Sequence, residues 1–182
     1  RPVGNRAVLR KTGVVGLVGQ RGIKVWVGGR EMFIKPSQVR FTQEWVSYTS
    51  SDKVNTLDTT GRTARIAPEQ LPAMDVVVMP DGRLTSLDNR RLTAAQLYNA
   101  ESVKVVIHDS NDMLPDADTV KRFTWDGNKP TTWSEAAAVR IFKQGSDFRE
   151  SFRQGSPIVP QVRQAPEDPF YRPYLITPTR RR

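Results

Sequence analysis

The stretch "MDVVVMPDGRLTSLDNRRLTAAQLYNAESVKVVIHD", residues 74–109, decides the fold. It begins with a continuous apolar run at residues 76–79, turns at the Asp81-Gly82 pair, and returns to a strand pattern at residues 84–87. An Asp-Gly pair between two apolar runs is typical of a tight β-hairpin. We therefore predict a hairpin over residues 76–87.

A helix and a further strand are predicted directly after this hairpin. Leu92, Ala95 and Tyr98 fall on one face of a helix over residues 89–98. Asn99 can end this helix in the left-handed conformation. The apolar run "VKVVIH" that follows predicts another strand, parallel to an earlier one.

The regions on either side carry weaker patterns. Short strands are predicted at residues 7–9, 14–18 and 23–27, the last entering a hairpin around Gly28-Gly29. Between the two hairpins we expect a turn at Pro36-Ser37, a polar stretch to residue 47, and one short helix and a loop over residues 50–70. After an acidic loop at 109–118, Thr132 and Glu135 form a capping box for a helix that Gly145 ends, and a shorter helix is predicted over residues 147–153.

These elements predict an α+β fold, with a small mixed sheet and a few helices. We assign residues 1–30 to an N-terminal β-rich extension or linker and residues 31–155 to an α/β domain. Residues 156–182 are Pro-rich and end in a basic cluster, which predicts an extended tail rather than a second domain.

Composition excludes several kinds of site. The 182-residue chain has no cysteine, so it has no disulfide, thiolate metal site or cysteine nucleophile. Its one histidine, His108, excludes every multi-histidine metal site. No apolar run approaches the length of a membrane span, so we expect no membrane insertion. The chain starts Arg-Pro-Val-Gly without an initiator Met, which is typical of a fragment of a longer protein.

The charge favours an anionic partner. Lys and Arg number 28 against 19 Asp and Glu, a net charge of +9. Such an excess suits nucleic acid, a nucleotide or an acidic protein. The alternative is that basic termini inflate the count, through Arg1, Arg6, Arg10, Lys11, Arg180, Arg181 and Arg182.

The junction Asp88-Asn89-Arg90-Arg91 is the candidate anion site. The first N–H groups of a helix lack internal partners, and the helix dipole makes that end positive. Two arginines there are unfavourable against the dipole unless an anion accompanies them, and they add charge-assisted hydrogen bonds to a phosphate. The alternative is that Asp88 is simply an N-cap and that the arginines are solvated or pair with Asp81, Asp109 or Glu101.

Residues 74–109, with the "DNRR" turn, resemble the core of the ParB/sulfiredoxin-like superfamily. In that family a strand and hairpin lead to a G-E-R-R or D-G-H-R turn, an Ala-rich helix and another strand. Here Asn89 stands where glycine is usual and Arg90 where histidine is usual, and the glutamate of the other version is missing. The upstream "FIKPSQVRFTQ" is similar to the family's opening strand and loop.

The resemblance implies a ParB/sulfiredoxin-like core with a pocket for nucleotide or nucleic-acid phosphates at this turn. The superfamily includes nucleotide-gated DNA-partition proteins, nucleotide-using enzymes and nuclease-like domains. The basic chain, with no initiator Met and with a Pro-rich tail, also looks like the C-terminal toxin modules of bacterial polymorphic toxins, of the Rhs and contact-dependent kinds. That likeness implies a delivered effector that acts in the cytoplasm of a target cell and is neutralised by a cognate immunity protein.

Within a nuclease the candidate catalytic residues have distinct roles. Arg90 and Arg91 would hold the phosphate and stabilise charge on its oxygens. Asp88 could bind Mg²⁺ or take a proton from the attacking water. His108, beside Asp109 at the end of a predicted strand, is a possible general acid or base, the alternative being a half-buried structural residue. Further phosphate- or nucleic-acid-binding candidates are Asn89, Arg40, Gln43 and Arg140.

No metal site is assigned, because the acidic loop at 109–118 lacks the glycine and terminal Glu of a calcium loop. The pattern as a whole favours an enzyme: a nuclease-like toxin acting on nucleic acid or nucleotide phosphates. The alternative is a non-toxic, nucleotide-gated DNA-binding module of the partition type. A third possibility is a purely structural domain whose arginines are paired internally.

Overall fold

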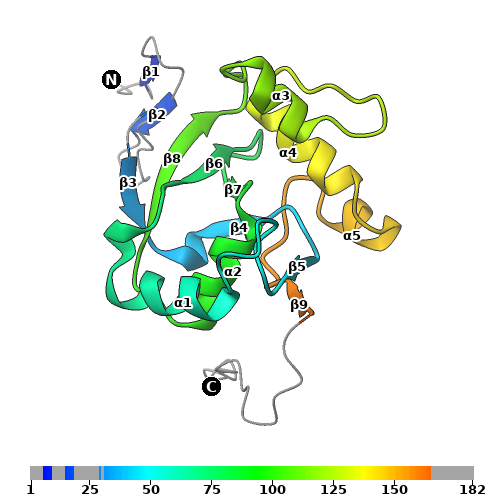
Figure 1. Ribbon diagram of the computed structural model, residues 1–182. Coiled ribbons are helices and arrows are strands. Elements are labelled where there is room, and N and C mark those ends of the chain that lie inside the picture. Colours follow the sequence, from blue (N-terminus) through cyan, green and yellow to red (C-terminus); the bar gives the residue numbers. More distant parts are fainter. Residues whose placement is uncertain (1–5, 10–14, 19–28, 30, 165–182) are drawn as a thin grey trace, which may run out of the picture.

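The computed structural model describes residues 6–9, 15–18, 29 and 31–164. A five-stranded mixed sheet lies at its centre, with the order β3-β8-β6-β7-β4 (Figure 1). The strands are β3 (Glu31–Ile34), β8 (Val103–Asp109), β6 (Met74–Val78), β7 (Leu84–Ser86) and β4 (Val39–Phe41). β4 is parallel to β7 and β6 to β8, while the other two pairings are antiparallel. The predicted α+β class with a mixed sheet is confirmed.

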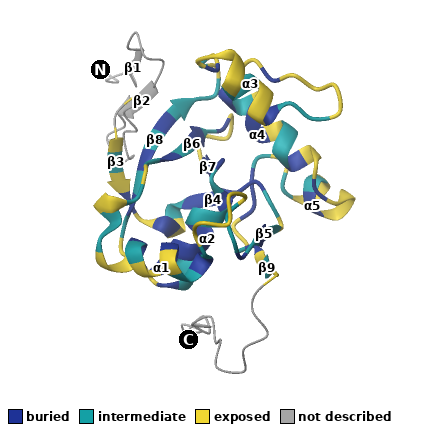
Figure 2. Cartoon of the chain, viewed as in Figure 1, coloured by how far each residue is buried: buried dark blue, intermediate teal, exposed yellow. Residues whose placement is uncertain are grey.

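Helices cover both faces of the sheet. One core cluster, with Val76, joins the sheet to α1 (Leu57–Ile66) and α2 (Asn89–Leu97). A second, with Val77, joins it to α3 (Ala117–Phe123) and α4 (Trp133–Phe142). Successive strand residues point to opposite faces, so a strand buried on both faces has a continuous apolar run. This explains the "VVV" of β6, and Figure 2 shows buried residues gathered in the sheet and in the helix faces turned to it.

The predicted core of the fold is confirmed element by element. β6 and β7 form the hairpin, with Val76 opposite Ser86 and Gly82 at φ 78° in the turn. α2 follows, and Asn99 takes the left-handed conformation at φ 51°. β8 then pairs in parallel with β6. A helix, α1, also lies within residues 50–70.

Two regions differ from the sequence expectation. The predicted polar stretch contains β4 and β5 (Trp45–Ser47), and all three residues of β4 are buried. Arg40 is buried because Asp81 neutralises its charge. The second difference is α3, which follows the acidic loop and begins where the Asp116 side chain accepts a hydrogen bond from the Thr119 N–H.

The predicted capping box of α4 is confirmed, since Thr132 and Glu135 each accept from the other's backbone N–H. α4 ends at Phe142, and Gly145 serves as N-cap of the short α5 (Ser146–Ser151). Two 3₁₀ helices complete the body, η1 (Pro36–Gln38) and η2 (Pro68–Gln70).

The first residues of the predicted tail belong to the packed domain. Ser156 is fully buried and exchanges two 2.8 Å backbone hydrogen bonds with Phe41. β9 (Gln161–Arg163) then pairs in parallel with β5. Pairing over so long a sequence separation leaves no local pattern, so the sequence does not predict it.

At the other end of the chain, β1 (Arg6–Leu9) and β2 (Val15–Val18) pair in antiparallel fashion, close to the predicted strands. The strand predicted at residues 23–27 and its partner turn residue Gly28 lie outside the described residues. None of the helices in the described ranges is long and apolar enough to cross a bilayer.

Candidate functional site

The DNRR junction, where β7 leads into α2, opens onto a hollow of about 360 Å³. We call it the arginine hollow, because four arginines and a single carboxylate, Asp88, line it. Two of the arginines belong to α2 and the others to α3 and α4, which the fold brings together from distant parts of the sequence: Arg90, Arg91, Arg122 and Arg140. The rest of the wall is formed by Gln43, Ser50, Ser51, Leu87 and Asn89.

Asp88 holds two of these arginines in place. One carboxylate oxygen lies 2.9 Å from Arg91 Nη2 and 3.2 Å from Arg122 Nη2, while the other accepts the backbone N–H of Asp75 at 2.7 Å. Burial acts to raise the pKa of Asp88, but the charge of Arg91 and the Asp75 N–H outweigh it, so that the pKa is lowered. Its side chain makes no capping hydrogen bond to α2. An ionised, fully engaged carboxylate is a poor proton acceptor, so this geometry suits Asp88 to positioning arginines.

Arg91 is fixed from two sides. Besides its ion pair with Asp88, its Nη1 donates to the carbonyl oxygens of Pro72 at 2.5 Å and Ala73 at 3.3 Å. The side chain is 22% exposed. Arg91 therefore lines the hollow in a fixed position, with its charge paired to Asp88 three residues before it.

Arg90 and Arg140 differ, because within the described residues neither forms an ion pair with an acidic side chain. Arg90 donates only a long hydrogen bond, 3.4 Å, to the Asn55 carbonyl, and burial together with Arg91 lowers its pKa. The Arg140 guanidinium lies 5.0 Å from the centre of the Phe123 ring. Burial, with a further contribution from Arg122, lowers the pKa of Arg140 to about 10. Two desolvated cations thus face one hollow.

Asn89 and Arg40 support the fold beside this site. Asn89 is buried and exchanges hydrogen bonds of 2.8 and 2.7 Å with the backbone N–H and hydroxyl of Thr42. These bonds fix the segment that carries Gln43 to the wall. Arg40, expected as a phosphate contact, does not line the hollow, because both its terminal nitrogens bind the Asp81 carboxylate, at 2.6 and 2.9 Å.

His108 is not among the residues that line the hollow. Its Nε2 lies 2.9 Å from Asp75 Oδ1, and its ring stacks on Trp133 at 3.7 Å between centroids. The side chain is 15% exposed. This geometry corresponds to the half-buried structural alternative, with Asp75 as the partner in place of the neighbouring Asp109.

The carboxylates in and beside the arginine hollow do not form a ligand set for Mg²⁺. Asp75 and Asp88 both face Arg122, at 3.7 and 3.2 Å, and among the described residues no three His, Asp or Glu side chains converge. Mg²⁺ requires near-octahedral oxygen coordination, which these engaged carboxylates do not offer.

The sequence reasoning missed three parts of this site: Arg122, Asp75 and the pair Ser50-Ser51. Arg122 was not named as a site residue, because no helix was predicted over residues 117–123. Two signals for this helix were available in the sequence. Asp116 can cap the start of a helix by accepting from the Thr119 N–H, and Lys121 and Arg122 suit the negative end of the helix dipole. The serines lie in an irregular loop, whose position no local pattern gives.

No family model, no curated protein and no solved structure matches this chain. The resemblance to the ParB/sulfiredoxin-like superfamily therefore stays a prediction. What the geometry provides by itself is a concave site with four guanidinium groups, one carboxylate and the N-terminus of a helix.

Proposed function

We propose that this chain binds a phosphate group of a nucleic acid or nucleotide in the arginine hollow and acts on it as a nuclease-like effector domain. The observation that carries the proposal is the pair Arg90 and Arg140, two partly desolvated cations that form no salt bridge in the described part of the chain and feel only weaker attraction from Asp52 and Asp88.

The physical argument concerns charge balance. Removing a cation from water without a counterion is costly, and an anion that enters the site recovers part of that cost. A phosphate suits the site because guanidinium groups bind its oxygens in bidentate fashion. The unpaired N–H groups at the start of α2 favour the same guest.

The proposed chemistry is stabilisation of charge on the phosphate oxygens. Asp88 and the carbonyls of Pro72 and Ala73 hold Arg91 in one position before a ligand arrives. Such preorganised donors favour a transition state in which charge develops at a fixed place. The positions of Asp88 and His108 do not favour either as a proton acceptor, so Asp88 is proposed as a positioning residue.

Binding and cleavage test this proposal directly. We expect Arg90→Ala and Arg140→Ala each to weaken binding of single-stranded DNA or RNA by about tenfold or more, as for loss of a charge-assisted contact. Lys35→Ala is the matched control, because Lys35 is an exposed cation that lines a different hollow, with Gln96 and Asn99. Equal loss in all three variants would mean that general charge, and not this site, binds the ligand.

The delivered-toxin form of the proposal draws on the family resemblance. It predicts that expression inside bacteria stops growth, that a cognate immunity protein prevents this, and that the double variant Arg90→Ala/Arg140→Ala is harmless. DNA, RNA and nucleotide pools would be inspected for the cleaved species. Tight binding without cleavage or growth arrest would instead support the partition-type alternative, which a DNA-shift assay with and without CTP would then examine.

A further inference from the structure

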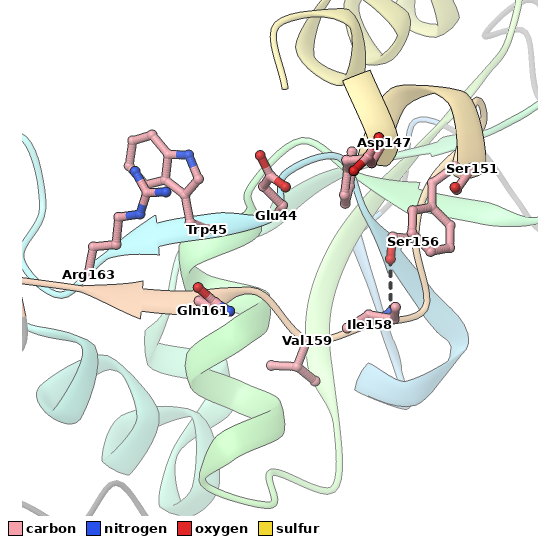
Figure 3. Close-up of a pocket in the computed structure, with 11 residues that line it drawn as sticks. Glu44, Trp45, Asp147, Ser151, Ser156, Ile158, Val159, Gln161 and Arg163 are labelled. Atoms are coloured by element: carbon pink, nitrogen blue, oxygen red, sulfur yellow. Dashed lines mark hydrogen bonds between the residues drawn. The ribbon is translucent and has the colours of Figure 1, made fainter. Parts of the chain in front are cut away.

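A second hollow, of about 400 Å³, lies on the other side of the segment that walls the arginine hollow. Gln43 lines the first hollow. The next residue, Glu44, lines the second, which Figure 3 shows. The two hollows are therefore lined by consecutive residues of one short segment, whose Cα atoms are about 3.8 Å apart. We call the second one the acidic hollow, after Glu44 and Asp147 in its wall.

Hydrogen bonds fix the Gln43-Glu44 segment that lies between the two hollows. The Glu44 N–H donates to Gln144 Oε1 at 3.2 Å, and the Gly145 N–H donates to Glu44 Oε1 at the same distance. Gln144 is itself buried and donates to the carbonyl of Arg140. Hydrogen bonds at the end of α4 therefore link Arg140, which lines one hollow, to Glu44, which lines the other.

The wall of the acidic hollow is aromatic as well as acidic. Trp45 enters from β5 with the Arg163 guanidinium 4.3 Å from its ring centre, as Figure 3 shows. Phe148 and Phe152 also line the hollow, with 5.3 Å between their ring centres. Flat rings and an arginine plane are the surfaces on which unpaired bases stack. Two carboxylates repel a second phosphate, so a neutral guest is favoured here.

We propose that the acidic hollow takes an unpaired guanine of the strand whose phosphate lies in the arginine hollow. The inference rests on the proposed function and names its substrate: single-stranded nucleic acid with a base preference. Guanine presents two adjacent donors, N1–H and N2–H₂, to a carboxylate. Adenine and cytosine each present one donor group beside an acceptor, and uracil presents one donor between two acceptors, which a carboxylate repels.

The test uses uridine hexanucleotides that carry one guanine, adenine, cytosine or abasic position in the middle. Their binding to the intact chain would be measured with the wild type, with Asp147→Asn and with Glu44→Gln, which keeps an oxygen for the Gly145 N–H. We expect the guanine strand to bind about tenfold more tightly than the abasic strand, the value of one stacked and hydrogen-bonded base. Both variants should remove most of that difference while binding the abasic strand as the wild type does.

The outcomes separate the two proposals. Equal binding of all strands, still weakened by Arg140→Ala, would overturn the guanine site and leave the phosphate site intact. No binding of any strand would overturn both. Base-independent binding of strands together with Asp147-dependent capture of an arginine-rich peptide would reassign the acidic hollow to a cationic partner and overturn the guanine proposal. Thermal unfolding of each variant would show that the fold is preserved.

Discussion

At the scale of the residue, the arginine hollow contains more positive than negative charge, and Arg140 shows the consequence most clearly. Its charge is desolvated, and burial lowers the pKa of Arg140 to about 10. Because the charged form is disfavoured in the folded chain, Arg140→Met should raise the free energy of unfolding by on the order of 1 kcal/mol, as other buried charges do when replaced by apolar groups. The same change should weaken phosphate binding about as much as Arg140→Ala does. Urea unfolding and ligand titration would measure the two effects, and a destabilised variant would show that Arg140 has an internal structural role.

Asp88 should behave in the opposite way. Its pKa is lowered below the ordinary value of 3.8 in the folded chain, so its contribution to stability is present above that value and is lost as the pH falls through the lower, folded pKa. We expect Asp88→Asn to cost about 3 kcal/mol near neutral pH, because Arg91 and Arg122 lose their partner. Urea unfolding near neutral pH and at about pH 3 should show this difference shrinking in acid. Asp118→Asn, at an exposed position in the first turn of α3, is the control and should change the free energy of unfolding near neutral pH only slightly.

The anion site expected at the DNRR turn stays a prediction, but the structure shows where its arginines lie. Arg90 and Arg91, at the start of α2, both line the arginine hollow. The sequence could not assign their partners. Arg91 pairs with Asp88 in its own turn and with carbonyls 18 and 19 residues away, and Arg40 is bound to Asp81. Such pairings depend on how β6 and β7 fold together.

At the scale of the element, the close approach of α1 and α2 depends on Gly61. A glycine in a helix interior costs about 1 kcal/mol relative to alanine, so Gly61→Ala would stabilise an isolated helix. In the folded chain a Cβ at this position would collide with the ring of Tyr98, which is buried. We therefore expect Gly61→Ala to lower the free energy of unfolding by about 2 kcal/mol, the typical cost of overpacking. Arg62→Ala, at the exposed next position, is the control and should be neutral or stabilising.

Elements with their own start and stop signals were predictable, and elements defined by distant partners were not. The capping box of α4 and the Asp-Gly turn of the β6–β7 hairpin are complete within a few residues. β5 and β9 are three residues each and exist because they pair with one another across more than a hundred residues of chain. α3 is seven residues long and buries one residue, Phe123, so it is too short to show a clear helical period.

At the scale of the whole molecule, the sheet gathers arginines from three helices into one place. α2 packs on one face of the sheet, while α3 and α4 pack on the other, and their arginines meet at the end of β7. A net charge of +9 would attract any polyanion, so charge alone does not distinguish this site from the rest of the surface. The distinction must come from how binding depends on salt.

Salt dependence therefore provides the last prediction. Each phosphate contact on a single strand contributes about 0.7 to the slope of log affinity against log salt, through the release of counterions. We expect Arg90→Ala and Arg140→Ala each to reduce the slope by about that amount. Lys35→Ala should leave the slope unchanged, because Lys35 lies by η1, which contacts the far end of α2 through the 3.0 Å bond from Gln96 to the Pro36 carbonyl. A nine-residue helix is about 13 Å long, more than the screening length of about 8 Å at physiological salt. If the three variants shift the slope equally, the strand follows the overall charge of the molecule, and the arginine hollow is not its binding site.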